Sequence, residues 1–246
     1  MTKKLRMAAI GAGRWGPNLI RNFASHPNSE MIAVVELLPA RRKAILDKYP
    51  HMIVTENFLD VLKNPNVDAV VICTPTEFHF EHAKAALEHN KHVFVEKPLA
   101  TTSEECKKLV AIAEERKLTL FVGHVFVYNA GVQAAAKYIK SGELGTIHYI
   151  HATRTNLGPI RTDVNALWDL APHDISIFQY WLNEIPTAVS ATGACFINPK
   201  IEDVAFATYS FASGGVANIH VSWLNPKKVR EIIVVGEKKM LLWDDM

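Results

Sequence analysis

Apolar positions recur with two different spacings along the first half of the chain. Short apolar runs of strand length lie at residues 5–10, 31–35, 52–54, 67–73, 92–95 and 118–122. Between them, residues 15–23, 39–47, 58–62 and 77–89 carry apolar side chains at helical spacing, and a further helix begins at 102–105. Such alternation of strand and helix requires right-handed crossovers, so it predicts a parallel sheet covered by helices on both faces.

The spacing changes after residue 124. One helical segment at 129–139 is followed by long strand-like runs at 146–154, 187–196, 204–211, 216–223 and 229–235, with a hairpin turn at 213–215. In the run 216–223 every second side chain is apolar, so one face of that strand belongs to a core and the other is polar. The pattern predicts a second domain, an antiparallel sheet with helices, that begins near Gly123 and His124.

Composition narrows the class of protein. At 246 residues, nearly half of them hydrophobic, the chain can bury the cores of two ordinary domains. The net charge is +2 and basic residues are scattered among the acids, so no stripe for nucleic acid is present. The three cysteines form no disulfide framework, which fits a reducing compartment. The basic start resembles a signal peptide, but the apolar run behind it stops at Gly11, too soon for one. We therefore expect a cytoplasmic protein. No run approaches the roughly 20 apolar residues that a membrane span needs.

The first strand runs into the sequence G-A-G-R-W-G at 11–16, and a helix follows. Strand, glycine turn and helix in this order are typical of dinucleotide binding. Gly11 permits a tight turn, Gly13 lets the backbone approach a pyrophosphate, and Gly16 lets the helix lie close to the strand. Glu36 ends the second strand 23 residues after Gly13, where a carboxylate can accept hydrogen bonds from both ribose hydroxyls. This carboxylate favours NAD over NADP. The argument against it is the arginine pair at 41–42, either of which can fold back over the adenine.

Two loops directly follow parallel strands and therefore lie at the carboxyl edge, where open α/β sheets bind ligands. The first is C-T-P-T at 73–76, whose proline stiffens the turn and whose threonines offer hydroxyls to a cofactor. Thr76 can also serve as a helix N-cap. The second is E-K-P-L-A at 96–100, in which Lys97 can hydrogen-bond a substrate hydroxyl and favour its ionisation. The alternative is a solvated lysine that pairs with Glu96.

The sequence W-D-L-A-P-H-D at 168–174 opens a helix, and Pro172 suits a first helical position. If the turn is already helical, Asp169 and His173 lie four apart on one face. The imidazole can then take a proton from an alcohol while Asp169 orients it or binds a neighbouring hydroxyl. Alone, such a pair is more often a capping arrangement. The H-x-x-H pair at 79–82 lacks a third ligand apart from an acid that helix capping explains, so no metal site is predicted.

Taken as a set, G-A-G-R-W-G, C-T-P-T-E-F-H, E-K-P-L-A and D-L-A-P-H-D-I resemble the Gfo/Idh/MocA oxidoreductases in order and spacing. The resemblance implies a Rossmann domain over 1–124 and an α+β domain over 125–246 whose large, mainly antiparallel, open sheet forms an oligomer interface. It also implies that Lys97 and His173 act at the nicotinamide, with Asp169 beside them. The stretches V-G-H-V-F-V-Y-N and R-T-N-L-G look similar to the branch of sugar-nucleotide dehydrogenases, such as UDP-N-acetylglucosamine 3-dehydrogenases.

Two features depart from the family pattern. The usual arginine after V-G-x is missing, since V-F-V-Y occupies 125–128. Family members are usually longer, and this chain ends at Met246 within a strand pattern, so we expect the last elements of the substrate domain to be absent. Both departures concern the substrate pocket and leave the cofactor site intact.

The sequence therefore predicts an NAD-dependent dehydrogenase that moves a hydride between the nicotinamide and a secondary alcohol of a sugar, an inositol or a nucleotide sugar, the UDP-N-acetyl-hexosamine type included. One alternative is a non-catalytic NAD-binding sensor or regulatory subunit, which need not keep the three catalytic side chains. Another is a dihydrodiol or imine/biliverdin-type reductase, which the D-x-x-x-H pair disfavours. The expected partners are the small-molecule substrate and further copies of the chain, and neither nucleic acid nor a membrane.

The candidate site residues are those expected at the cofactor, those expected at the substrate, and further basic residues. Those expected at the cofactor are Gly11, Ala12, Gly13, Arg14, Trp15, Gly16, Glu36, Cys73, Thr74, Pro75, Thr76, His79, Glu96 and Lys97. Those expected at the substrate are Lys97, Arg154, Asn156, Trp168, Asp169 and His173, and the catalytic residues among them are Lys97, Asp169 and His173. Arg161, Lys227 and Lys228 are further basic residues that can reach a substrate phosphate, although solvation is the ordinary role of each.

Overall fold

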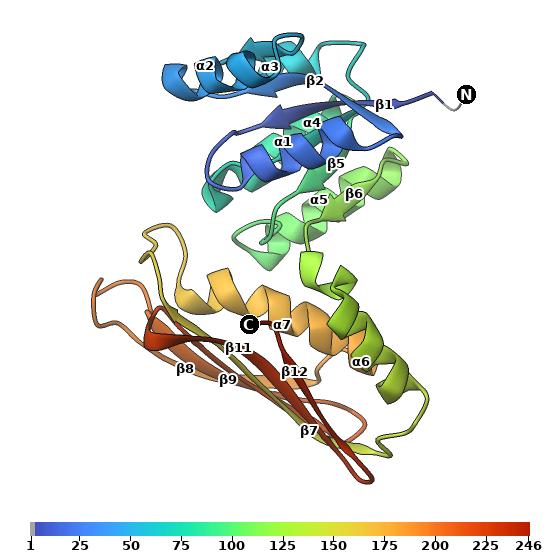
Figure 1. Ribbon diagram of the computed structural model, residues 1–246, viewed down its shortest axis with the longest axis vertical. Helices are drawn as coiled ribbons and strands as arrows, with labels where there is room; N and C mark the ends of the chain where they lie inside the picture. The colour runs from blue at the N-terminus through green and yellow to red at the C-terminus, as the bar shows by residue number, and fades with distance from the viewer. Residues whose placement is uncertain (1–2) are drawn as a thin grey trace. The chain divides into compact units, whose positions relative to one another are not determined.

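The computed structural model describes residues 3–246, which divide into two compact units, one up to Gly123 and one from His124 onward. Each unit contains one six-stranded sheet (Figure 1). Within the described part of the chain, no helix is long and apolar enough to cross a membrane.

The first unit is a parallel sheet with the strand order β3-β2-β1-β4-β5-β6. Its strands are β1 (Leu5–Ile10), β2 (Ser29–Val35), β3 (Ile53–Thr55), β4 (Ala69–Ile72), β5 (His92–Val95) and β6 (Leu120–Val122). Its helices are α1 (Gly16–Ser25), α2 (Pro39–Lys48), α3 (Phe58–Leu62), the 3-10 turn η1 (Thr76–Phe78), α4 (His79–Glu88) and α5 (Ser103–Glu115). The strand order reverses at β1, between β2 and β4, and sheets of this kind bind ligands beyond the carboxyl ends of the strands at that point.

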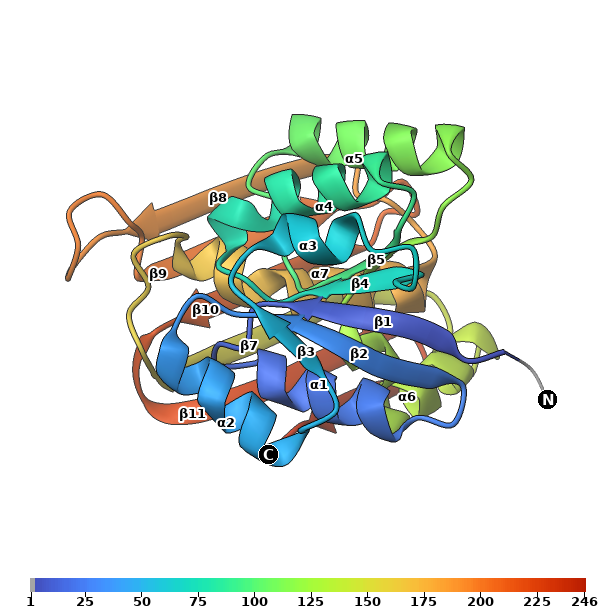
Figure 2. The same cartoon turned by 90° about the horizontal axis from the view of Figure 1, so that it is seen from above.

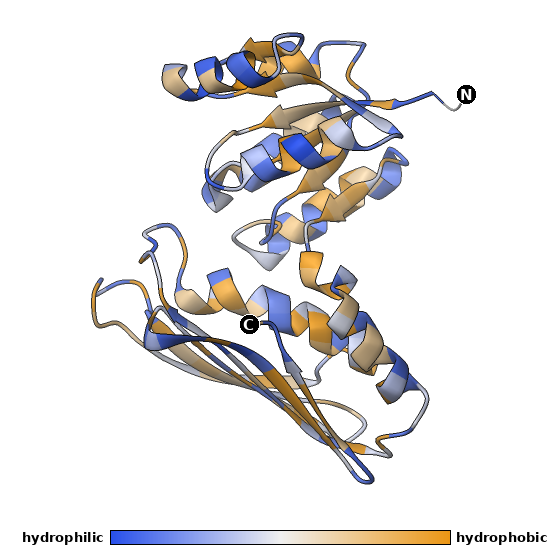
Figure 3. Cartoon of the chain, viewed as in Figure 1, coloured by the Kyte–Doolittle hydropathy of each residue, from blue (hydrophilic) through white to orange (hydrophobic). Residues whose placement is uncertain are grey.

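Two helical layers bury this sheet on both faces. Figure 2 shows α1 and α2 on one side of the strands and α3, α4 and α5 on the other. Met7 and Ala9 of β1 belong to the cluster that contains Leu19 and Ile20 of α1. Ala8 and Ile10 belong to the opposite cluster, with residues of α3, α4 and α5. Because both faces are covered, the strands are apolar almost throughout, as Figure 3 shows.

Local signals set the ends of several helices. The Thr102 side chain accepts a hydrogen bond from the N–H of Glu105, whose carboxylate accepts from the N–H of Thr102 (3.2 Å each). This capping box begins α5, and so the predicted N-cap is confirmed. Asn90, just beyond α4, has φ 58°, which is the left-handed conformation predicted for it.

The second unit is a mixed sheet with the order β12-β11-β7-β10-β9-β8. Its strands are β7 (Ile147–Leu157), β8 (Ala188–Ala194), β9 (Val204–Ser210), β10 (Val216–Ser222), β11 (Leu224–Gly236) and β12 (Met240–Asp244). Its helices are the 3-10 turn η2 (Val125–Tyr128), α6 (Ala130–Lys140) and α7 (Ala166–Leu182). Neighbouring strands are antiparallel except for β7 and β10, which are parallel, so the prediction of a mainly antiparallel sheet is correct.

One face of this sheet carries the core and the other is open. Helices α6 and α7 pack on the core face, where Ile177, Phe178 and Trp181 of α7 are buried against β7, β9, β10 and β11 (Figure 1). On the opposite face polar side chains join neighbouring strands, with a His151 to Asn218 side-chain distance of 3.1 Å. Among the described residues no helix covers that face.

The start of α7 differs from the prediction. Asn165, not a residue near Pro172, is the N-cap, since its side chain accepts a hydrogen bond from the N–H of Trp168 at 2.9 Å. Pro172 therefore lies inside the helix, so the prediction of a first helical position for it is wrong. Because the turn before Pro172 is already helical, Asp169 and His173 are one turn apart on the same helix.

Candidate active site

The glycine loop between β1 and α1 has two glycines that the fold itself requires. Gly11 has φ +94°, and a Cβ on Gly16 would lie 2.5 Å from the carbonyl oxygen of Gly11. Gly13 is different, since a Cβ there would meet only Nη1 of Arg41, at an ordinary contact distance of 3.7 Å. Protein packing therefore does not explain the glycine at 13. A ligand that approaches the backbone does explain it, and so the loop fits a pyrophosphate.

Glu36 follows β2 and is tied to this loop. Its Oε2 accepts a hydrogen bond from the N–H of Ala12 at 2.9 Å, and its Oε1 accepts from the N–H of Leu38 at 2.9 Å. The side chain is buried, but a carboxylate oxygen can accept more than one hydrogen bond. Nη1 of Arg41 lies 3.7 Å from Oε2, so the structure places a cation beside the acid expected at the ribose.

The two loops at the carboxyl edge of the first sheet are joined by His79. This ring is buried, with Nδ1 2.7 Å from the carbonyl oxygen of Pro98 and Nε2 2.8 Å from that of Thr74. Since carbonyl oxygens only accept, each contact is a hydrogen bond when the ring nitrogen carries a proton. His79 thus connects the C-T-P-T loop to the E-K-P loop. Nδ1 of the nearby His82 lies 3.2 Å from Oγ1 of Thr74, and burial lowers the pKa of His82.

Thr76 does not cap the helix after this loop. It is the first residue of η1, it is buried, and the N-cap of η1 is Pro75 while that of α4 is Phe78. The alternative of an N-cap threonine is therefore wrong.

Glu96 and Lys97 lie at the end of β5. Burial raises the pKa of Glu96, and the N–H and charge of Lys97 and a hydrogen bond from Trp15 oppose that rise. Oε1 of Glu96 is buried and has no hydrogen-bond partner among the described residues. Beside this loop, Cys73 is half-buried, and burial raises the pKa of its thiol. The glycine loop and the E-K-P loop are therefore linked through Trp15 and Glu96.

In the second unit, Asp169 is held from outside its own helix. Nη1 of Arg161 donates to Oδ1 at 2.9 Å, and Nε1 of Trp223 donates to Oδ2 at 3.2 Å. Arg161 also binds Asp163, and these hydrogen bonds lower the pKa of Asp163. These two hydrogen bonds fix the orientation of the Asp169 carboxylate, which lies one helical turn before His173.

His173 packs against an aromatic ring from η2. Its ring centroid is 4.7 Å from that of Phe126 at an interplanar angle of 64°, an edge-on contact. The guanidinium carbon of Arg154 lies 4.6 Å from the same Phe126 ring, and Arg154 is bound to Asp174. Arg154, which is expected at the substrate, has a side chain that is 3% exposed and a charge that is paired with Asp174.

Two further substrate candidates, Trp168 and Asn156, are more exposed. Trp168 is 40% exposed in the first turn of α7, and Asn156 is half-buried near the end of β7. Three side chains that contact candidate site residues, Phe126, Asp174 and Trp223, were not predicted from the sequence. A signal for Asp174 did exist, because Arg154 interrupts the alternating apolar stripe of β7 and a buried charge needs a partner.

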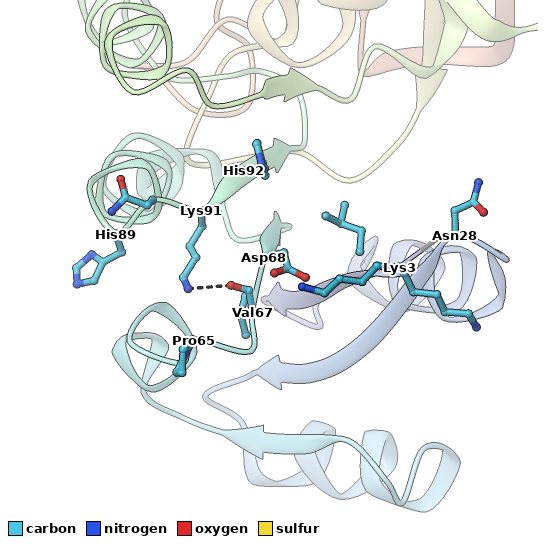
Figure 4. A pocket seen from close by; sticks show the side chains of 11 residues that line it. Lys3, Asn28, Pro65, Val67, Asp68, His89, Lys91 and His92 are labelled. Atoms are coloured by element: carbon cyan, nitrogen blue, oxygen red, sulfur yellow. Dashed lines mark hydrogen bonds between the residues drawn. The ribbon is translucent and has the colours of Figure 1, made fainter. Parts of the chain in front are cut away.

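A concave surface lies at the opposite edge of the first sheet, where the strands begin (Figure 4). Two of its charged side chains, Lys91 and Asp68, are bound by other residues of the first unit. Nζ of Lys91 donates to the carbonyl oxygens of Asn64 and Val67 at 2.8 Å each, and Asp68 binds Arg6. We assign no ligand to this surface.

Residues 5–124 match the model of an oxidoreductase family with an NAD-binding Rossmann fold, GFO_IDH_MocA, and residues 132–242 match the GFO/IDH/MocA C-terminal domain. The scyllo-inositol 2-dehydrogenase (NAD(+)) of Bacillus subtilis is 30% identical over 237 residues, which cover 92% of this chain and 69% of that protein.

Two further matches involve nucleotide sugars, one by the name of the enzyme and one by the molecule in its complex. The UDP-N-acetylglucosamine 3-dehydrogenase of Acidithiobacillus ferrooxidans is 32% identical over 180 residues, 73% of this chain and 54% of that protein. The structure of the WlbA dehydrogenase from Bordetella pertussis with NADH and UDP-GlcNAcA is 25% identical, with a TM-score of 0.91. That match covers 98% of this chain and 74% of the other.

Proposed function

Because the chain belongs to the Gfo/Idh/MocA oxidoreductases, whose amino-terminal domain binds NAD, we propose that it oxidises a secondary alcohol of a sugar, an inositol or a nucleotide sugar. The observation that carries the proposal is the arrangement on α7, where Asp169 and His173 are one turn apart. Arg161 and Trp223 fix the Asp169 carboxylate. A sensor that only binds NAD has no need for such an arrangement.

The cofactor is held by groups of the first unit. Backbone N–H groups at 12–16 bind the pyrophosphate, with Gly13 leaving room for it. Glu36 accepts from the adenosine ribose, and Arg14, Trp15 and the loops at 73–76 and 96–97 line the rest of the cofactor. His79 is buried, so its contribution is to hold these two loops together.

The chain's own side chains handle the proton and the developing charge. NAD, when bound, accepts the hydride that leaves the carbinol carbon. His173 takes the hydroxyl proton, since neutral imidazole is a base near neutral pH. Lys97 stabilises the developing alkoxide, an electrostatic effect worth about 3–4 kcal/mol in comparable sites. Asp169 orients the substrate or the imidazole.

The finer proposal is a nucleotide-sugar substrate of the UDP-N-acetyl-hexosamine type. One relative is named for such a molecule, and WlbA, whose structure contains one, matches over nearly the whole of this chain. Asn156, Trp168 and the basic pair Lys227 and Lys228 are the candidates for contact with that substrate. The inositols are the competing class, since scyllo-inositol is named in the Bacillus subtilis relative.

The test is turnover with NAD and a panel of scyllo-inositol, myo-inositol, UDP-N-acetylglucosamine and its uronic acid. We expect one class to reduce NAD, with turnover that rises with pH because only neutral imidazole accepts a proton. His173→Asn should remove that rise and lower turnover, while His148→Asn, on an exposed position of β7, should change neither. Tight NAD binding without turnover on any of the panel would favour the sensor.

We also propose that the open face of the second sheet binds the same face of another copy. Tyr149, Phe206 and Leu242 are large, exposed side chains, and they alternate with core residues, which puts them on this face. Phe206 stacks on His220, with 4.4 Å between the ring centroids, and this contact orients its ring. Sedimentation of the protein should report an oligomer that Phe206→Glu weakens. A monomer at all concentrations would refute the proposal.

A further inference from the structure

We infer that Arg154 is a positioning residue that fixes the ring of His173 through two routes, one through Asp174 and one through Phe126. The inference rests on the proposed function, in which His173 takes the proton. Arg154 itself touches neither cofactor nor substrate in this account. All four side chains belong to the second unit, so the inference depends only on contacts within it.

The first route is an ion pair on the helix that carries His173. Nε of Arg154 lies 3.1 Å from both oxygens of Asp174, and Nη2 lies 2.7 Å from Oδ1. The side chains are 3% and 1% exposed, so solvent does not screen the pair. Three charge-assisted hydrogen bonds therefore anchor α7 to β7 at the residue after His173.

The second route passes through an aromatic ring. The planar guanidinium of Arg154 lies over Phe126, with 4.6 Å from its central carbon to the ring centroid. That ring meets the ring of His173 edge-on at 4.7 Å, and Trp243 packs on Phe126 at 6.0 Å. Phe126 is thus held by a cation and an indole, and it limits the rotation of the His173 side chain.

The two routes explain why the residue is arginine. A lysine would keep the positive charge near Asp174 but would lack the planar fork that binds both carboxylate oxygens and stacks on a ring. Phe126 lies in η2 and Arg154 in β7, so the guanidinium links β7 to η2 as well as to α7.

The first test needs no substrate. The free protein is labelled with ¹³C-histidine and studied by NMR. The ring resonance of His173 is the one that disappears in His173→Asn. Arg154→Lys and Phe126→Leu should each move or broaden this signal, whereas Phe126→Tyr, which keeps the ring, should leave it close to its original position. Arg6→Lys, in the Arg6–Asp68 pair of the first unit, is the matched control and should leave it unchanged.

The second test uses turnover of scyllo-inositol and UDP-N-acetylglucosamine. Arg154→Lys and Phe126→Leu should lower kcat by about 10- to 100-fold, the effect of a misplaced reacting group, with KM and NAD affinity within about twofold. Phe126→Tyr should retain kcat. An unmoved His173 signal in Arg154→Lys, or a loss that appears only in KM, would overturn the inference. Full turnover by His173→Asn would instead remove the proposed function on which it rests.

Discussion

Replacement of Gly13 by alanine separates the requirements of folding from those of cofactor binding. A Cβ on Gly13 meets only the Nη1 atom of Arg41, at 3.7 Å, and the φ of this residue lies outside the left-handed range. We therefore expect Gly13→Ala to change the free energy of unfolding by no more than about 0.5 kcal/mol. The methyl group would occupy the space that a pyrophosphate needs.

The expected loss of NAD affinity follows from the hydrogen bonds to phosphate. Loss of one hydrogen bond to a charged group is worth about 1.5–3 kcal/mol, so the NAD dissociation constant should rise by about ten- to a hundredfold. The contrasting variant is Gly16→Ala, whose Cβ would lie 2.5 Å from the Gly11 carbonyl oxygen and which should lower stability by about 1–3 kcal/mol.

The assay is urea denaturation and NAD titration by calorimetry on the same preparations of wild type, Gly13→Ala and Gly16→Ala. NAD binding by Gly13→Ala as tight as that of wild type would contradict this role of Gly13. A loss of stability in that variant as large as in Gly16→Ala would contradict it equally, because Gly13 would then serve the fold and not the ligand.

Three further predictions follow from particular contacts. NAD should bind at least about tenfold more tightly than NADP, because Glu36 repels a 2′-phosphate. Equal affinities would show that Arg41, 3.7 Å from Glu36, reverses the preference. His79→Leu removes the ring nitrogens that contact the carbonyl oxygens of Pro98 and Thr74, so the free energy of unfolding should fall by about 1–3 kcal/mol and NAD affinity should weaken. An unchanged urea midpoint would rule out the connection between the two loops. The pKa of Asp68 is lowered to about 2 by its hydrogen bond from Arg6, so its stabilising effect is present above its ordinary pKa and disappears as the pH falls toward 2. Acid titration of stability should show this loss in wild type and not in Asp68→Asn, with a small amplitude since the pair is partly exposed.

The first unit could be predicted from sequence because its signals are local. Residues 58–62 and 92–95 form the predicted helix and strand without any shift of bounds, and the glycine loop connects β1 to α1 as expected. The start of α7 could not be predicted in the same way. Pro172 favours a first helical position, but packing of Ala166 and Ala171 into the core extends the helix before it.

Candidate site residues could be predicted only where the residues next to them in the sequence form a recognisable motif. Lys97, Asp169 and His173 could be proposed from the sequence because each follows a strand end or lies at helical spacing. The side chains that hold them come from distant parts of the chain: Trp223 lies 54 residues from Asp169. No local pattern reports such contacts, since they depend on which strands become neighbours in the sheet.

The most direct measurement of the central claim follows a deuterium atom. Perdeuterated scyllo-inositol, or UDP-N-acetylglucosamine deuterated at its carbinol carbons, is incubated with NAD and the protein, and deuterium at the nicotinamide ring is measured by mass spectrometry. We predict that the reduced cofactor gains one deuterium, and that Lys97→Ala and His173→Asn lower the rate by at least about 100-fold while NAD still binds. Lys107→Ala, exposed on α5, is the matched control and should keep the full rate. Transfer at the wild-type rate in both active-site variants, or no transfer from either alcohol by wild-type protein that binds NAD, would contradict the account.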